Sequence, residues 1–513
     1  RDHQALELAT RVGARALIMP SVREVYGKLR VSLDVLDPST GKTVYSEHAD
    51  GRGLDSSLAS IDKVTTSLRR NLGEALAEIT QHSAPLPKVA TSSLDALHAY
   101  AVGADAYLDS RHDDAMGHFE QATRLDPDFA AAYIGQMRIA FARGNFDRAR
   151  ELLALAMSRR DHLSARDGLY LDSWVAELDG SGPVETAHRW KLLGDLYPDF
   201  YAAHHNRSGA LFTLGLYKEA ERAVRLALAP QNPMRMLSVR QLARTELAQN
   251  KNGEALASFQ QVSVEGAPDR ELAAAMAAMG DFDGAWRILD AIPEDAVPAW
   301  LERIAVAVDQ GDVRQALRNA ERARVLCKVD ASVCGTFDLQ VLALRLETGS
   351  APDGAEFEEW LRYFHQQATR EQSAEKNDWA FMAATALYLA QRSGHARLVA
   401  TWLPRLSAMA GQIGERRVQQ MVSLVEAGAE ADDGAAAERL AHLRAQIDGT
   451  ELIQVHAQLL ALYERSGDER AAQRERAWLA VQRGLAYSEN AGTYSLMALN
   501  VADVRRAREA LAR

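Results

Sequence analysis

Apolar and polar positions follow one repeated pattern through the middle of the chain. In GLYKEAERAVRLALAP at residues 215–230, a Gly is followed by an apolar residue two positions later, by Ala five positions later and by an amphipathic stretch. The Gly, or its replacement, and the Ala recur as Ser110/Ala115, Gly144/Ala149, Gly182/Ala187, Gly215/Ala220, Asn250/Ala255, Gly280/Ala285 and Gly311/Ala316, which are 30–38 residues apart. A period of about 34 residues with two helices per unit predicts a helical solenoid.

Each position of this pattern has a structural cause. Gly or Asn can end a helix in the left-handed conformation, which costs other side chains a steric penalty. The Ala lets the second helix of a pair pack closely against the first. A second small residue often follows seven positions later, as Ala122, Ala156, Ala227 and Ala323. We therefore predict antiparallel helix pairs over residues 94–328, in a mainly α fold whose pairs form an α-α superhelix.

The first 84 residues have a different period. Residues 29–35 alternate between apolar side chains, such as Leu29 and Val31, and polar ones, such as Arg30, which is typical of a half-buried strand. Turn-forming residues lie at 26–28 and 37–41, and residues 57–79 return to a helical stripe. Residues 1–84 are thus expected to form a small α/β unit: a helix, a three-strand meander and a helix. Residues 85–93 have the composition of a linker, and Ser93 can cap the next helix.

Beyond residue 328 the repeated pattern fades. Helical stripes continue, for example in DWAFMAATALYLAQRSG, and Gly467 with Ala472 repeats the turn once more. We expect degenerate helical repeats over residues 329–513, with loops at 349–354 and 428–434.

The clearest unit resembles a tetratricopeptide repeat. In GADAYLDSRHDDAMGHFEQATRLDPDFAAAY, six residues fall on signature positions of that family: Gly103, Ser110, Ala115, Phe119, Ala122 and Pro127, with Ser110 replacing the usual Gly. Later units depart from the signature, since Gly194, Val262 and Ile292 replace the second small residue. The resemblance implies a module that binds a protein or peptide.

The order of the modules carries a further resemblance. GARALIMPSVREVYGKLRVSLDVLDPSTGKTVYSEHADG followed by such repeats is similar to the TolB-like-plus-repeat half of bacterial multidomain signalling proteins, over roughly the first 330 residues. Those proteins carry at their front a class III adenylate/guanylate cyclase, a serine/threonine kinase or a winged-helix domain. The chain most resembles the cyclases that accompany peptide-modification gene clusters. The resemblance implies a regulatory or sensing C-terminal half whose catalytic domain is missing here; a free-standing scaffold protein is the alternative.

Charge and hydropathy narrow the classes of partner. The chain has 59 Lys and Arg against 70 Asp and Glu, a net charge of −11, without a concentrated basic surface of the kind that duplex nucleic acid requires. No apolar run approaches the roughly 18–20 residues of a spanning helix. The chain opens on RDHQALELAT, and we expect it to be the C-terminal part of a longer protein, cytoplasmic or periplasmic, and in the latter case tethered to the inner membrane through a missing N-terminal part.

Sequence signatures of catalysis are missing. STGKT at 39–43 lacks the Gly that a phosphate-binding loop needs five positions earlier, where Leu36 stands, and a strand pattern follows it. His204 and His205 are adjacent and point about 100° apart on a helix, so one metal ion cannot take both. No set of nucleophile, base and orienting residue is evident, and we expect no enzymatic activity, metal site or cofactor in this segment.

The two cysteines, Cys327 and Cys334, flank a short loop in LCKVDASVCG. They could form a disulfide in an oxidising compartment. The alternative is two small buried apolar side chains.

A repeat array also has an inner surface formed by its first helices. Positions fifteen and eleven residues before the signature Ala should line it, and they include Tyr100, Arg138, Asp172, His205, Arg240, Arg244 and Arg270. We interpret this basic, partly aromatic line as a candidate groove for an acidic peptide or a carboxylate terminus. The alternative is a set of ordinary solvent-facing polar residues.

Overall fold

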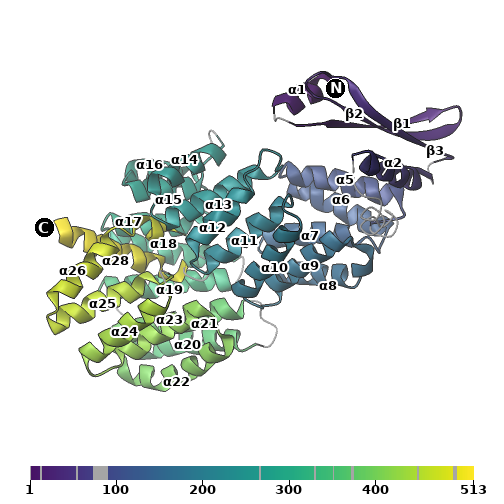
Figure 1. Ribbon diagram of the computed structural model, residues 1–513. Helices are drawn as coiled ribbons and strands as arrows, with labels where there is room; N and C mark the ends of the chain where they lie inside the picture. The colour runs from purple at the N-terminus through teal and green to yellow at the C-terminus, as the bar shows by residue number, and fades with distance from the viewer. Residues whose placement is uncertain are drawn as a thin grey trace. The chain divides into compact units, whose positions relative to one another are not determined.

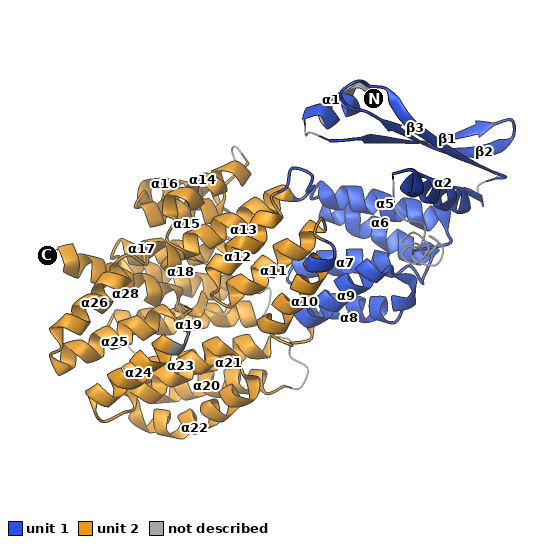
Figure 2. Ribbon diagram, in the orientation of Figure 1, with its two compact units in different colours: residues 1–178, 195–197, 229–234 blue, residues 179–194, 198–228, 235–513 orange. Residues whose placement is uncertain are grey.

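The computed structural model describes residues 2–11, 14–53, 56–72, 90–264, 267–328, 331–350, 352–370, 375–447, 450–488 and 494–512 (Figure 1). The predicted end of the helix at 73–79 and the first part of the linker, 85–89, lie outside these ranges. The described residues group into two compact units (Figure 2). Unit 1 contains residues 1–178, 195–197 and 229–234, and unit 2 contains residues 179–194, 198–228 and 235–513.

Unit 1 begins with the predicted small α/β element. Helix α1 (Asp2–Arg11) precedes an antiparallel sheet of order β1-β2-β3, formed by β1 (Leu17–Val25), β2 (Lys28–Leu36) and β3 (Thr43–Gly51). Val31 of β2 stands opposite Val22 and Ala49, and it packs with Ala49 on Val64 of α2 (Ser57–Asn71). Residues 39–42 of the STGKT segment lie in the turn between β2 and β3, as the sequence predicted, and Thr43 begins β3.

The rest of the described chain is helical, and neighbouring helices pack in pairs. The fold class predicted from the sequence, mainly α with tetratricopeptide-type pairs behind a small α/β unit, is confirmed. In unit 1 the helices are α5 (Leu94–Leu108), α6 (His112–Leu125), α7 (Ala130–Ala142), α8 (Phe146–Met157), η2 (Arg160–His162) and α9 (Ala165–Leu178). Ser93 caps α5 as expected, because its Oγ accepts a hydrogen bond from the Ala96 amide at 3.2 Å.

The helices that follow are α10 (Pro183–Leu196), α11 (Tyr201–Thr213), α12 (Tyr217–Leu226), α13 (Arg235–Ala248), α14 (Asn252–Val262), α15 (Arg270–Met279), α16 (Phe282–Ala291), α17 (Ala299–Asp309), α18 (Val313–Leu326) and α19 (Ala331–Glu347). Then come α20 (Gly354–Ala368), α21 (Lys376–Arg392), α22 (Ala396–Ile413), α23 (Arg416–Gly428), α24 (Asp433–Ile447), α25 (Ile453–Ser466), α26 (Glu469–Ala480), α27 (Arg483–Tyr487), η3 (Tyr494–Leu496) and α28 (Met497–Ala512).

The repeated sequence pattern corresponds to the turns between paired helices. All seven predicted turn residues have positive φ: Ser110, Gly144, Gly182, Gly215, Asn250, Gly280 and Gly311. The non-glycine residues among them, Ser110 at φ 60° and Asn250 at φ 59°, adopt the left-handed conformation despite its steric cost. The Ala five positions later is fully buried in six of the seven units, and Ala187 is 8% exposed. The pattern therefore encodes the turn and the contact between helices.

In unit 2 the last helices of the chain, α27 and α28, pack against earlier helices of the same unit: α27 contacts α13 and α15, and α28 contacts α17 and α19 (Figure 1). Asn250 accepts a hydrogen bond from the Leu485 amide at 3.0 Å, and Arg483 donates one to Asp309 at 2.8 Å. The Gln340 side chain on α19 accepts from the Ala498 amide at 3.1 Å. Helix α28 shares an apolar core with α13, α15, α17 and α19. The chain's own C-terminal segment thus fills this part of the inner surface.

Candidate functional site

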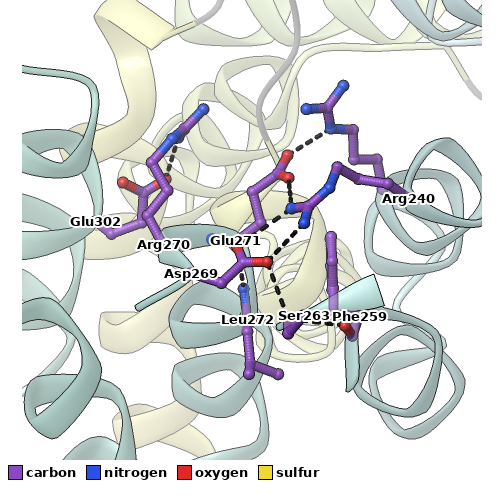
Figure 3. A network of polar contacts seen from close by, with 9 residues as sticks. Arg240, Phe259, Ser263, Asp269, Arg270, Glu271, Leu272 and Glu302 are labelled. Atoms are coloured by element: carbon purple, nitrogen blue, oxygen red, sulfur yellow. Dashed lines mark hydrogen bonds and ion pairs between the residues drawn. The ribbon is translucent and has the colours of Figure 1, made fainter. Parts of the chain in front are cut away.

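The predicted basic line in unit 2 is an ion-pair network. Arg240 on α13 donates to Asp269 at 2.8 Å and to Glu271 at 2.6 Å. Asp269 is the N-cap of α15 and accepts from the Glu271 amide at 3.0 Å, so the helix start fixes its position. Arg244 donates to the same Glu271 carboxylate. Arg270 donates to Glu302 of α17 at 2.7 Å (Figure 3).

Burial and charge set the ionisation of this network. Burial raises the pKa of Glu271, but Arg244, Arg270 and Arg240 outweigh that effect and leave the pKa below its usual value. Glu302 is 1% exposed, and burial raises its pKa more than Arg270 lowers it. Three arginines thus face three carboxylates, Asp269, Glu271 and Glu302. The three arginines of this network therefore do not face solvent as ordinary surface residues do. They also do not form a purely basic surface, because each pairs with a carboxylate.

His205, also in unit 2, is held within the protein. Its Nδ1 atom lies 3.2 Å from Ser238 Oγ of α13. Burial, assisted by the charge of Arg244, lowers the pKa of His205 to about 4. The imidazole is therefore neutral at pH 7 and adds no positive charge to the inner face.

Two of the predicted residues in unit 1 have local structural roles. Asp172 on α9 accepts from Arg160, with Arg160 Nη2 at 2.7 Å from Asp172 Oδ2. Tyr100 on α5 packs in an aromatic cluster, 5.5 Å from the ring of Phe119 and 5.0 Å from that of Phe129.

Arg138 of α7 has different surroundings. Its guanidinium carbon lies 4.0 Å from the ring centroid of Tyr107 on α5, and its Nη2 atom is 4.0 Å from Met234 Sδ. Tyr100 and Tyr170 are close enough to influence its charge. Among the residues that the structure describes, no carboxylate forms an ion pair with Arg138. This arginine, half-buried among three tyrosines, is the cation of the predicted line whose charge the described part of the chain leaves unbalanced.

Two of the tyrosines around Arg138, Tyr100 and Tyr170, have raised pKa values and remain protonated at pH 7. Burial raises the pKa of Tyr100 and of Tyr170, although the charge of Arg138 lowers both. Burial lowers the pKa of Arg138 itself, but the oxygens of Tyr170, Tyr107 and Tyr100 outweigh it, so the pKa is raised and the guanidinium stays charged. The cluster can therefore offer hydrogen-bond donors to an anion.

Sequence reasoning missed the partners of these residues. The carboxylates are Asp269 at the N-cap of α15, Glu271 in α15 and Glu302 in α17. Two sequence features could have indicated them: the N-cap position of Asp269, and Glu302 as the one acidic residue in the apolar stretch AWLERIAVAV. Tyr107 and Tyr170 lie on α5 and α9, the first helices on either side of α7. Their aromatic character was visible in the sequence, whereas their convergence on Arg138 required the fold.

Cys327 and Cys334 form a disulfide that joins the end of α18 to α19, with the Cα atoms 5.6 Å apart. Within the described ranges, no group of three or more His, Cys, Asp or Glu side chains could hold a metal ion. A search of the same residues found no helix with the length and hydropathy to cross a membrane.

Comparison with known families is informative for one segment. Residues 106–166, which run from α5 into α9, match the family model described as tetratricopeptide repeat. The chain contains a tetratricopeptide repeat. The matched repeat includes Arg138 and Tyr107 of the cluster described above. No curated protein sequence matches the chain.

Two solved structures of other proteins show a low structural similarity to this chain. PilW, a widely conserved type IV pilus biogenesis factor, is 17% identical over 45% of this chain and 94% of its own, with a TM-score of 0.27. The tetratricopeptide repeat domain of P58(IPK) is 15% identical over 82% of this chain and 98% of its own, with a TM-score of 0.22. At TM-scores this low, neither structure serves as a template for this chain.

Proposed function

We propose that unit 1 binds a peptide segment of a partner protein and that the segment presents a carboxylate to Arg138. The observation that carries the proposal is a charged, half-buried guanidinium without a carboxylate partner among the described residues. A cation withdrawn from water is stabilised by an anion and by hydrogen bonds. An acidic side chain or a terminal carboxylate of a partner would supply both.

Apolar contacts beside Arg138 support a peptide rather than a small inorganic anion. The ring of Phe141 on α7 lies 5.0 Å from that of Trp174 on α9, and Tyr170 lies 6.2 Å from Trp174. Aromatic side chains next to a cation favour ligands that have an apolar group beside an acidic one. We therefore expect the partner segment to combine a carboxylate with a neighbouring hydrophobic residue.

The inner face of unit 2 is the weaker candidate for the same role. Its arginines are paired with Asp269, Glu271 and Glu302, and the chain's own C-terminal segment packs on α13, α15, α17 and α19. A partner would have to displace these contacts before it could bind. In this proposal the tetratricopeptide-type repeats of unit 1 supply the binding surface.

An immobilised peptide array can test the proposal. Wild-type protein, R138Q and the control R143Q are applied to peptides with an acidic residue next to an apolar one and to matched peptides with Asn or Gln instead. Arg143 lies at the end of the same helix and is paired with Asp113 at 2.6 Å on the surface. We expect wild type and R143Q to retain a set of acidic peptides that R138Q does not retain. Equal retention by R138Q would refute the assignment.

From the similarity of the first 330 residues to bacterial signalling proteins, we further propose a regulatory role. Peptide binding would bias a catalytic domain, most simply a class III nucleotide cyclase; a kinase, a winged-helix regulator or a free-standing scaffold are the alternatives. The matching family model is the tetratricopeptide repeat over residues 106–166, and no curated protein sequence matches the chain. The coding sequence upstream of Arg1 discriminates between these proposals, because a cyclase domain supports the first and a start codon supports the scaffold.

A further inference from the structure

The disulfide between Cys327 and Cys334 lies where the recognisable repeats meet the rest of the helical array. Cys327 is the C-cap of α18, and Cys334 lies in the first turn of α19. The two residues are only seven positions apart in the sequence. The bond is therefore a covalent link between two consecutive helix ends in unit 2.

The surroundings of the bond are partly open to solvent. Both cysteines are half-buried. The side chains beside them in the sequence, Val325 and Val333, are 65% and 38% exposed. A disulfide enclosed in a core is shielded from dissolved thiols, whereas a partly exposed one is open to exchange.

Cations lie on both sides of Cys327 in the sequence. Arg324, one turn earlier in α18, and Lys328, the next residue, are exposed. Among the residues that the structure describes, neither forms an ion pair with a carboxylate; Arg324 acts at longer range on Asp338 of α19. Asp330 is the one acidic residue in the connection between α18 and α19. Cations beside a sulfur atom attract an anionic thiol and favour the thiolate, the form that carries out exchange.

The two sulfur atoms are not equivalent. The first turn of α19 has the positive end of a helix dipole, which stabilises a thiolate on Cys334. Cys327 ends α18, where the dipole has the opposite sign. Because a better stabilised thiolate leaves faster, an incoming thiolate should attack Cys327 and release Cys334.

We propose that this disulfide is a thiol–disulfide exchange site for small thiols with a net negative charge. The thiolate attacks the sulfur of Cys327 and forms a new S–S bond there. The electron pair of the Cys327–Cys334 bond leaves with Cys334, which takes a proton from water. A second thiolate then attacks the sulfur of the first thiol, leaves with it as a small disulfide and releases Cys327, which is protonated in turn. Two thiols are thus oxidised to one disulfide, while the protein bond is reduced to two thiols and the link between α18 and α19 is lost.

Reduction of the native full chain by glutathione, which is anionic, and by cysteamine, which is cationic, tests the proposal. The reaction is quenched with acid at successive times, and mass spectrometry measures the oxidised, mixed-disulfide and reduced forms. At low ionic strength we expect glutathione to react at least about threefold faster per thiolate than cysteamine, and this difference should vanish at about 1 M salt, which screens the attraction. The first product should have glutathione on Cys327.

Two substitutions and a control assign the selectivity. R324Q combined with K328Q removes both cations and should lower the rate with glutathione at least about threefold, but not the rate with cysteamine. R314Q should leave both rates unchanged, because Arg314 is exposed at the start of the same helix, about 20 Å from its end. Reduction that requires denaturant, equal rates for the two thiols at low ionic strength, or glutathione found first on Cys334 would overturn the proposal. The outcome does not depend on whether Arg138 binds a peptide.

Discussion

Arg138 and Arg244 occupy the same repeat position, eleven residues before the signature alanines Ala149 and Ala255, yet their surroundings differ. Arg244 donates to Glu271, whereas Arg138 lies over the ring of Tyr107 with no carboxylate partner among the described residues. The same position thus supports folding in one unit and leaves an available charge in the other. This difference is why we place peptide binding in unit 1.

Removing the charge of Glu271 should destabilise the protein. In E271Q, Arg240 and Arg244 lose a buried ionic partner, and we expect the free energy of unfolding to fall by about 3 kcal/mol. Denaturant unfolding of the full chain measures this change in the free energy of unfolding. The control is E294Q, whose exposed pair with Arg322 should contribute little. Equal stability of the two variants would contradict a structural role for the network.

Substitution by glycine should have different effects on the free energy of unfolding at the two non-glycine turn residues, Ser110 and Asn250. S110G relieves a left-handed conformation without removing a long-range contact, and we expect a gain of about 1 kcal/mol in unfolding free energy. Asn250 also bonds Gln482 at 2.7 Å and the Leu485 amide at 3.0 Å, so N250G loses these bonds and should gain nothing or be destabilised. Denaturant unfolding of both variants is the measurement. A stabilisation by N250G as large as that by S110G would show that the C-terminal segment does not depend on Asn250.

Asp338 on α19 should make stability depend on pH. Burial raises the pKa of Asp338 to about 7, partly offset by Arg324. Because the folded pKa exceeds the unfolded value, folding favours the protonated form: the penalty is absent below about pH 4, grows as pH rises and is complete above about pH 7. D338N should therefore match wild type at pH 4 and exceed it at pH 8 by on the order of 2–4 kcal/mol. A stability difference that is the same at both pH values would contradict this ionisation.

The disulfide between Cys327 and Cys334 closes a short loop between α18 and α19. Loop-closure entropy predicts that its reduction lowers the unfolding free energy by about 2–3 kcal/mol. Unfolding with and without a reductant measures the change, and C334S, which cannot form the bond, should be insensitive to the reductant. Identical unfolding of oxidised and reduced wild type would show that the bond adds no stability.

Local features were predictable from the sequence, whereas long-range pairings were not. Ser110 and Asn250 were predicted at turns because the spacing to Ala115 and Ala255 is local, and their positive φ confirms this prediction. The partner of Arg270 is Glu302, one repeat away, and Asn250 meets Leu485 across 235 residues. A periodic pattern does not specify long-range contacts such as these. They depend on how the helix pairs stack and on which helices the C-terminal segment packs against.

The same limit explains the candidate site. The sequence placed Arg138 on an inner face, but its lack of a carboxylate partner and the convergence of Tyr107 and Tyr170 from neighbouring helices depend on three-dimensional packing. Arg240, Arg244 and Arg270 were predicted in the same way, and only the structure shows that carboxylates neutralise them.

A double-mutant cycle on peptide binding tests the central claim most directly. The affinity of an acidic peptide selected on the array is measured for wild type and R138Q, each with the peptide and with its Asn or Gln counterpart. If Arg138 binds the carboxylate, each single change should weaken binding about tenfold or more, and the double change should weaken it little further, because both remove the same interaction. Independent, additive losses, or an R138Q variant that binds as tightly as wild type, would contradict the account.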